Sequence, residues 1–207
     1  MQKNLLLVFV KNPELGKCKT RLAATIGDEK ALTFYRNMLQ HTKPIVEDVQ
    51  ADKQIHYSAY IDQDDIWPND GDFSKQLQES GDLGDKMKAA FKAGFEAGYE
   101  RVSIIGSDCY TITSTIINGA FRALESKDTV LGPSTDGGYY LVGMQHLIPE
   151  IFESKNWSTE SVTPDTIKDF ETQGKSYELL TALTDIDTEA DLMTIPTAAR
   201  NLLLSNK

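Results

Sequence analysis

Residues 5–22 read LLLVFVKNPELGKCKTRL, an apolar strand-like run that passes without a break into a loop rich in cations. Lys11, Lys17, Lys19 and Arg21 gather in this loop, although the chain as a whole has a formal net charge of −10. An open α/β sheet binds its ligands in the crevice at the carboxyl ends of its strands, and lysine and arginine form charge-assisted hydrogen bonds with phosphate. The loop therefore predicts a polyanion site, and the simpler alternative is a solvated turn before a basic helix.

The loop matches neither of two well-known phosphate-binding motifs. Gly16 is its only glycine and no G-K-[ST] sequence ends it, which excludes a Walker A loop. The G-x-G-x-x-G sequence of a dinucleotide fold is missing as well. A phosphate bound here must therefore be held in another way.

Length and composition bound the classes of protein that come into question. The 207 residues, of which 40% are hydrophobic, predict one globular domain over 1–207. The acidic balance argues against partners such as nucleic acids and anionic membranes, and no apolar run approaches the roughly 18 residues of a membrane span. Cys18 and Cys109 are the only cysteines, and the opening apolar run lacks a small-residue cleavage site. Both observations favour the reducing cytoplasm.

Strand-like runs alternate with helical patterns along the chain, which predicts an α/β fold with an open, mostly parallel sheet and helices on both faces. The expected strands are residues 5–10, 54–61, 101–106, 129–131 and 139–143, with a weak one at 177–180. The expected helices run from about 28 to a kink or end at Pro44, from 86 to 98, from 113 to 126, and after 158–159. Residues 62–72 are interpreted as an acidic solvated loop, and 188–191 fit a capping box.

A second candidate site lies in residues 104–109, where Asp108 follows the end of a buried-type strand. This carboxylate lies at the same edge of the sheet as the cationic loop if the two strands are parallel neighbours. A carboxylate beside a polyphosphate typically holds a divalent cation. The alternative is that Asp108 caps the following helix or forms a turn, as aspartate often does.

A third candidate is the turn Asp136-Gly137-Gly138, which stands between Gly132-Pro133 and Tyr139-Tyr140. Glycine tolerates the positive φ of tight turns, so a plain turn is the simpler interpretation. The flanking residues nevertheless predict a rigid turn with aromatic walls that could seat a base, a sugar or an acceptor.

The fourth candidate is Asp185-x-Asp187, which imitates the paired carboxylates of haloacid dehalogenase-type phosphatases. Those enzymes need Thr or Val where this chain has Glu189, and the strand before the pair is weak. We therefore reject the phosphatase interpretation and retain Asp187 as a second metal ligand.

In combination, these motifs resemble, over almost the whole chain, an uncharacterised bacterial glycosyltransferase-like family of the nucleotide-diphospho-sugar transferase superfamily. The matching stretches are residues 11–22, 81–87, 106–109, 132–140, 157–159 and 185–188. The loop Lys19-Thr20-Arg21 also looks like that of 2-phospho-lactate guanylyltransferases. The resemblance implies the Rossmann-like GT-A fold of that superfamily.

The resemblance also implies a role for each matching position. The nucleotide and its phosphates would be bound by Lys11, Lys19, Arg21 and Gly84. A divalent metal, Mg²⁺ or Mn²⁺, would be held by Asp108 and Asp187. Asp108 and Asp136 would be catalytic, with Asp136 acting as a base or positioning the transferred group. The acceptor or sugar pocket would be formed by Gly137, Gly138 and Tyr139.

The implied activity is transfer from a nucleotide-activated sugar to a small-molecule acceptor. The first alternative is a nucleotidyltransferase that uses a nucleoside triphosphate and releases pyrophosphate. The second is an inactive nucleotide-binding relative, which is favoured by Tyr110 because most relatives would have proline there.

Overall fold

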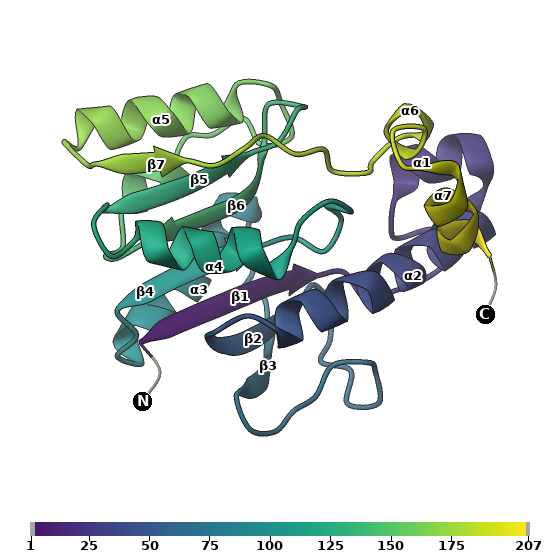
Figure 1. The fold of residues 1–207 in the computed structure, drawn as a ribbon, viewed down its shortest axis with the longest axis horizontal. Helices are drawn as coiled ribbons and strands as arrows, with labels where there is room; N and C mark the ends of the chain where they lie inside the picture. Colours follow the sequence, from purple (N-terminus) through teal and green to yellow (C-terminus); the bar gives the residue numbers. More distant parts are fainter. Residues whose placement is uncertain (1–2, 206–207) are drawn as a thin grey trace.

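A seven-stranded sheet forms the centre of the computed structural model, which describes residues 3–205 (Figure 1). Its strands lie in the order β3-β2-β1-β4-β6-β5-β7. They are β1 (Asn4–Val10), β2 (Asp52–Tyr57), β3 (Phe73–Leu77), β4 (Arg101–Ile105), β5 (Thr129–Pro133), β6 (Tyr139–Met144) and β7 (Tyr177–Leu179). Only β6 runs antiparallel to its neighbours among these strands, so the mostly parallel open sheet predicted from the sequence is confirmed.

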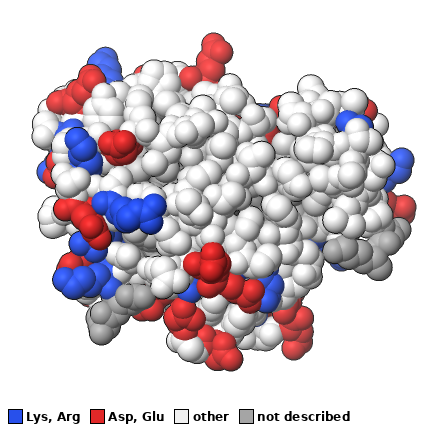
Figure 2. Space-filling view, viewed as in Figure 1, with Lys and Arg blue, Asp and Glu red and all other residues white. Residues whose placement is uncertain are grey.

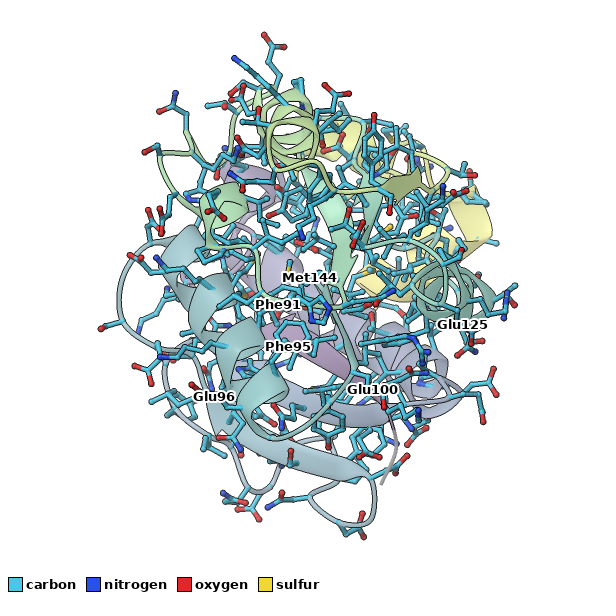
Figure 3. All side chains as sticks on the ribbon, turned by 90° about the vertical axis from the view of Figure 1, so that its left-hand side faces the viewer. Phe91, Phe95, Glu96, Glu100, Glu125 and Met144 are labelled. Atoms are coloured by element: carbon cyan, nitrogen blue, oxygen red, sulfur yellow. The ribbon has the colours of Figure 1, made fainter. Side chains whose placement is uncertain are left out.

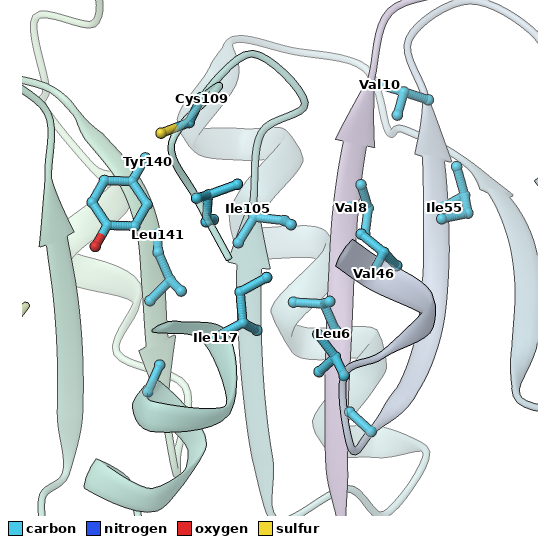
Figure 4. Packing of buried hydrophobic residues seen from close by; sticks show 14 of the residues in the cluster. Leu6, Val8, Val10, Val46, Ile55, Ile105, Cys109, Ile117, Tyr140 and Leu141 are labelled. Atoms are coloured by element: carbon cyan, nitrogen blue, oxygen red, sulfur yellow. The ribbon is translucent and has the colours of Figure 1, made fainter. Parts of the chain in front are cut away.

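Helices cover both faces of the sheet, as the alternating pattern predicts. They are α1 (Thr20–Ile26), α2 (Asp28–Glu47), α3 (Leu83–Glu96), α4 (Ser114–Ala123), the 3₁₀ helix η1 (Pro149–Phe152), α5 (Val162–Thr172), α6 (Glu189–Leu192) and α7 (Thr197–Leu204). Leu6 and Val8 of β1 pack into one core with Val46 of α2 and Ile117 of α4 (Figure 4). Leu5 and Leu7 point to the other face, because successive strand residues alternate.

The amphipathic pattern of α3 shows how a covering helix is seated. Phe91 is buried with its ring centroid 6.4 Å from that of Phe95, and Phe91 belongs to the same core as Met144 of β6. Figure 3 shows these three side chains close together, whereas Glu96 lies at the outer surface of the helix. Burial of the aromatic rings fixes α3 on the sheet and so fixes the position of its N-terminus.

Several predicted boundaries differ from those in the structure. The strand expected over 54–61 ends at Tyr57, because the N–H groups of Ala59 and Tyr60 donate to Oδ1 of Asn12 and leave the strand ladder. The helix that was expected to kink or end at Pro44 does not end there, since α2 continues to Glu47. Proline removes the hydrogen bond to the carbonyl of residue 40 and crowds that carbonyl, and the helix ends only three residues later.

The carboxyl ends of the central strands place the candidate residues at one edge. β1 and β4 are parallel neighbours, so the loop that begins at Lys11 and the segment that begins at Gly106 leave the sheet side by side. In Figure 1 the arrowhead of β1 points toward α1, and the chain after β7 crosses the molecule to α6, which lies beside α1.

Charged residues do not form one patch on the face that Figure 2 shows, where Lys and Arg alternate with Asp and Glu around the margin. Within residues 3–205, no helix has both the length and the apolar character that crossing a membrane requires.

We expect His56 of β2 to lower the free energy of unfolding in mild acid. Its ring is 5% exposed and stacks on Phe9 at a centroid distance of 5.3 Å. Burial lowers the pKa of His56 to about 4, whereas an unfolded histidine titrates near 6.5. Protons therefore bind the unfolded chain more tightly, and stability falls as the pH drops from about 6.5 toward 4. Urea unfolding should show a loss from this residue of about 2 kcal/mol between pH 7.5 and pH 5.

The variant His56→Phe should remove that part of the pH dependence and retain the stacking surface. The matched control is His146→Gln, at an exposed position, which should leave the difference between the two pH values as it is in the wild type. An H56F variant that loses as much stability in acid as the wild type would contradict the assignment.

Candidate functional site

A cavity of about 500 Å³ opens at the carboxyl edge of β1 and β4. Its lining includes Lys11, Lys19, Arg21, Asp108, Asp136, Tyr139 and Asp187 of the residues predicted from the sequence. Gly84, Gly137 and Gly138 are not part of this lining. A second cavity, of about 800 Å³, lies between α2 and the loop at 62–67. Of the site residues predicted from the sequence, only Lys11 lines it.

The ammonium group of Lys19 lies at the centre of the site. Its Nζ is 3.0 Å from Oδ2 of Asp108 and 2.7 Å from Oδ1 of Asp187. Only 5% of the Lys19 side chain is exposed, against 35% for Asp108 and 39% for Asp187. Burial by itself would lower the pKa of Lys19, but the two carboxylates raise it above its usual value, so the ammonium stays charged.

The backbone of Lys19 adopts a conformation that is unusual for a residue with a side chain. Its φ of 50° and ψ of 45° are left-handed, and the residue stands at the N-cap of α1 without forming a side-chain cap. Such a conformation costs on the order of 1 kcal/mol, and strained residues of this kind concentrate at functional sites. The ion pairs with Asp108 and Asp187 contribute to holding Lys19 in this position.

The two segments that carry the carboxylates are joined through their backbones. Ile186 N donates to the carbonyl of Asp108 at 3.0 Å, and Cys109 and Asp185 form an antiparallel bridge. Asp187 then precedes α6, whose start is fixed by the capping box that the sequence predicts at Thr188. The positions of Asp108 and Asp187 are therefore coupled by main-chain hydrogen bonds.

Asp187 is ionised under ordinary conditions. Burial alone would raise its pKa, but Lys19, then Arg21 and Lys11, outweigh this effect and lower the pKa below its usual value.

Asp185 is a site residue that the sequence analysis did not select. It lines the same cavity, and its Oδ1 is buried without a hydrogen-bond partner among residues 3–205. Burial first, and then repulsion from Asp108, raise the pKa of Asp185. The signal was present in the sequence, because residues 185 and 187 of an extended segment point to the same side.

Three further cations line the cavity. They are Lys11 and Arg21, which the sequence predicts, and Lys86 in the first turns of α3, which it does not. None of the three side chains has an ion pair within the described part of the chain. They are therefore available to an anionic ligand.

Two polar side chains fix the start of the cationic loop. Nδ2 of Asn12 donates to the carbonyl of Tyr60 at 2.9 Å, which ties this loop to the segment after β2. The hydroxyl of Tyr35 accepts from Lys11 N at 2.8 Å and lies 3.2 Å from Oγ of Ser107. Tyr35, a residue of α2, therefore connects the ends of β1 and β4.

The Asp136 turn has a structural role as well as a place in the cavity. Oδ1 of Asp136 accepts from Gly138 N at 3.1 Å, as in an ordinary aspartate turn. Gly137 has a φ of +90°, and a Cβ there would lie 2.2 Å from Cα of Glu160. Gly137 is thus required by its packing, and Tyr139 is the aromatic wall that reaches the cavity.

Gly84 lies against another part of the fold. A Cβ at this position would stand 2.3 Å from the carbonyl oxygen of Phe152 and 2.8 Å from the ring of Trp157. Trp157 also meets Tyr139 edge to face, at 6.4 Å between centroids. The structure therefore explains Gly84 by close packing of α3 on this segment.

Tyr110 is anchored through aromatic stacking. Its ring lies 4.6 Å from that of His41 at an interplanar angle of 20°, and Nε2 of His41 is 2.8 Å from the carbonyl oxygen of Tyr110. These contacts attach the segment after Asp108 to α2. A proline at position 110 would instead stiffen the segment by fixing its φ angle.

The donor set at the centre fits a hard divalent cation. Mg²⁺ is typically bound through one or two carboxylates together with substrate phosphates, and Asp108 and Asp187 supply two that already converge on one positive charge. No group of three or more His, Cys, Asp or Glu side chains within residues 3–205 could hold a metal by itself. The residues therefore suit a metal that arrives with a phosphate ligand.

Comparisons with known proteins agree with this architecture. A family model described as "Uncharacterized protein conserved in bacteria (DUF2064)" matches residues 42–159. A Desulfovibrio desulfuricans G20 protein that carries the name nucleotide-diphospho-sugar transferase is 31% identical, with a TM-score of 0.87 over 97% of this chain and 89% of that one. No curated protein matches the sequence.

More distant structures share the fold. The 4-diphosphocytidyl-2C-methyl-D-erythritol synthase of Anaerococcus prevotii is 13% identical, with a TM-score of 0.59 over 99% of this chain and 97% of that one. Rv0371c of Mycobacterium tuberculosis, in complex with manganese, is 10% identical, with a TM-score of 0.55 over 100% of both chains.

Proposed function

Because the chain belongs to this bacterial family, within the nucleotide-diphospho-sugar transferase superfamily, we propose that it is a metal-dependent transferase acting on a nucleotide-activated sugar. The observation that carries the proposal is the convergence of Asp108, Asp187 and Lys19 in a cavity that also contains Arg21 and Lys11. Anionic oxygen donors beside unpaired cations are what a metal–diphosphate ligand requires.

In this proposal the carboxylates bind the metal and the cationic side chains bind the phosphates. Asp108 and Asp187 would hold Mg²⁺ or Mn²⁺, and the metal would neutralise charge that develops on the leaving phosphates. Arg21, Lys11 and Lys86 would bind the phosphate oxygens directly, because their side chains have no ion pair among residues 3–205. Fixed charges of this kind stabilise a transition state without reorganisation.

Transfer of the sugar then needs an acceptor and a base. The acceptor oxygen forms a bond to the anomeric carbon while the bond from that carbon to the diphosphate breaks, and the nucleoside diphosphate leaves. Asp136 lines the cavity, and we assign it to receive the acceptor proton or to position the sugar beside Tyr139. The acceptor is a small molecule that the cavity admits.

Nucleotidyl transfer is the second candidate, and the surplus of cations favours it. Lys11, Arg21 and Lys86 line the cavity. Their positive charge, added to that of a divalent metal, exceeds the negative charge of the diphosphate in a nucleotide sugar. A nucleoside triphosphate carries more negative charge and matches this surplus better. In this reaction the acceptor oxygen attacks the α-phosphorus, the α–β phosphoanhydride bond breaks, and pyrophosphate leaves. A metal held by Asp108 and Asp187 would neutralise the charge on the leaving pyrophosphate.

Product analysis separates the two reactions. Incubation with nucleotide sugars or nucleoside triphosphates, Mg²⁺ and a mixture of small-molecule acceptors that carry hydroxyl or phosphate groups, followed by ³¹P NMR, should yield a nucleoside diphosphate for glycosyl transfer and pyrophosphate for nucleotidyl transfer. Recovery of every nucleotide intact, although it binds, would instead identify an inactive nucleotide-binding relative.

Arg21→Ala should weaken binding of nucleoside diphosphates by about tenfold to a hundredfold, which corresponds to one charge-assisted hydrogen bond of about 1.5–3 kcal/mol. Isothermal titration should show this loss without a change in the ranking of the nucleobases. The matched control is Arg122→Ala on the exposed side of α4, which should bind as the wild type does. A changed ranking of the bases would show that Arg21 contacts the nucleoside.

A further inference from the structure

The ammonium of Lys19 lies at the position where Asp108 and Asp187 converge. It makes hydrogen bonds of 3.0 Å and 2.7 Å to one oxygen of each carboxylate. A divalent cation bound by these same oxygens would be a few ångströms or less from the ammonium, where two positive charges repel each other strongly in a poorly solvated site. Lys19 and a metal therefore compete for the same two carboxylates.

We propose that Lys19 is a resident counter-ion of the cation site, which the metal and the nucleotide phosphates displace together. The inference rests on the proposed function and adds a coupling between its two ligands. Lysine carries its charge on a flexible four-carbon stem, so the ammonium can leave the carboxylates without a change of fold. The side chain of Lys19 is only 5% exposed, so the displaced ammonium needs a new anionic partner close by.

A phosphate in the same cavity supplies that partner. Lys19, Arg21 and Lys11 line one cavity, so a phosphate bound by Arg21 or Lys11 is within the space that Lys19 already borders. Metal alone would leave a buried ammonium without its carboxylates, and phosphate alone would find Lys19 already paired. Binding of either ligand therefore lowers the free-energy cost of separating Lys19 from the carboxylates when the other ligand binds. The two ligands should for this reason bind with positive coupling.

The coupling has a direct signature in metal binding without nucleotide. The wild type should bind Mn²⁺ alone weakly, as measured by the electron paramagnetic resonance signal of free Mn²⁺. Lys19→Met removes the charge and retains the length of the side chain, and it should tighten binding of Mn²⁺ alone at least tenfold. Addition of pyrophosphate, corrected for the complex it forms with Mn²⁺ in solution, should tighten Mn²⁺ binding about tenfold more in the wild type than in K19M, where only direct ligation of Mn²⁺ by pyrophosphate couples the two ligands.

Three further variants make the result unambiguous. Lys19→Arg keeps the positive charge and should bind Mn²⁺ alone as weakly as the wild type. Lys92→Met removes an exposed lysine of α3 and should leave the Mn²⁺ affinity unchanged. The double variant Lys19→Met with Asp108→Asn should lose the gain in affinity, because the added binding uses the freed carboxylates.

An unchanged or weaker Mn²⁺ affinity in K19M would show that Lys19 is not a counter-ion that the metal displaces. The proposed metal site would still stand in that case, provided that Asp108→Asn abolishes metal-dependent nucleotide binding. If Asp108→Asn has no effect on that binding, the proposed metal site fails instead. Should K19M not fold, the wild type decides: Mn²⁺ binding that pyrophosphate leaves unchanged would overturn the coupling.

Discussion

Asp108→Asn should lower metal-dependent turnover of the nucleotide substrate by about a thousandfold while the fold is retained. The amide has the shape of the carboxylate but carries no negative charge, so it is a poor ligand for Mg²⁺. Loss of a group that stabilises charge in the transition state typically costs a factor of about 10² to 10³, and loss of the metal as well places this variant at the upper end.

The fold should persist because the backbone of Asp108 is held independently of its side chain. Its carbonyl accepts from Ile186 N at 3.0 Å, and the adjacent Cys109 pairs with Asp185. Steady-state kinetics at several Mg²⁺ concentrations measure the effect, and thermal unfolding confirms the fold. Asp70→Asn in the exposed loop before β3 is the matched control and should retain full turnover. A D108N enzyme within tenfold of the wild type would exclude Asp108 as a metal ligand.

Gly84→Ala should destabilise the protein by about 3 kcal/mol, as expected for an overpacked position. The added methyl group would stand 2.3 Å from the carbonyl oxygen of Phe152, a backbone atom that cannot move aside as a flexible side chain can. The ring of Trp157 blocks another direction at 2.8 Å. Urea unfolding at pH 7.5 measures the change.

A second helical glycine provides the control. A methyl group at Gly119 of α4 would meet only the Arg122 side chain, at 3.6 Å. Gly119→Ala should therefore stabilise the protein by about 0.5–1 kcal/mol, because alanine has the higher helix propensity. A G84A protein as stable as the wild type but unable to bind nucleotide would instead support the role implied by the family resemblance, in which Gly84 lets the backbone approach the nucleoside.

The central part of the fold could be predicted because its signals are local. Leu5 to Val10 is a continuous apolar run, typical of a strand buried on both faces, and the strand before Asp108 has the same character. Parallel pairing of β1 and β4 then brings their carboxyl ends together. The prediction that the cationic loop and Asp108 share one sheet edge is confirmed on this basis.

Elements without a hydrophobic signature could not be recognised. The strand β3 reads FSKQL, and its central Lys75 is buried because its ammonium lies 2.8 Å from Oδ1 of Asp65. A buried lysine that depends on a partner ten residues away leaves no periodic pattern. The short helix α7 was missed as well, and α1 was considered only in the alternative of a turn before a basic helix. Both helices pack on α2, a contact that their own sequences do not indicate.

Pairing between distant charges was equally hidden at the site. Lys19 was expected to bind phosphate, but its partners are 89 and 168 residues away, and no spacing rule connects them. Lys86 lies in the first turn of α3, which begins at Leu83, three residues before the predicted start. The sequence therefore indicated several of the charged residues that line the cavity, and the tertiary structure determines which of these charges neutralise one another.

We propose that the cavity at the carboxyl edge of β1 and β4 binds a nucleotide through a divalent metal. A thermal-shift screen of nucleoside triphosphates and nucleotide sugars, each with and without Mg²⁺ or Mn²⁺, tests it most directly, because a ligand that binds only the native state raises the melting temperature. We expect at least one nucleotide to raise the melting temperature only when metal is present, and Asp108→Asn to remove this rise. Melting temperatures that no nucleotide changes, with or without metal, would contradict it.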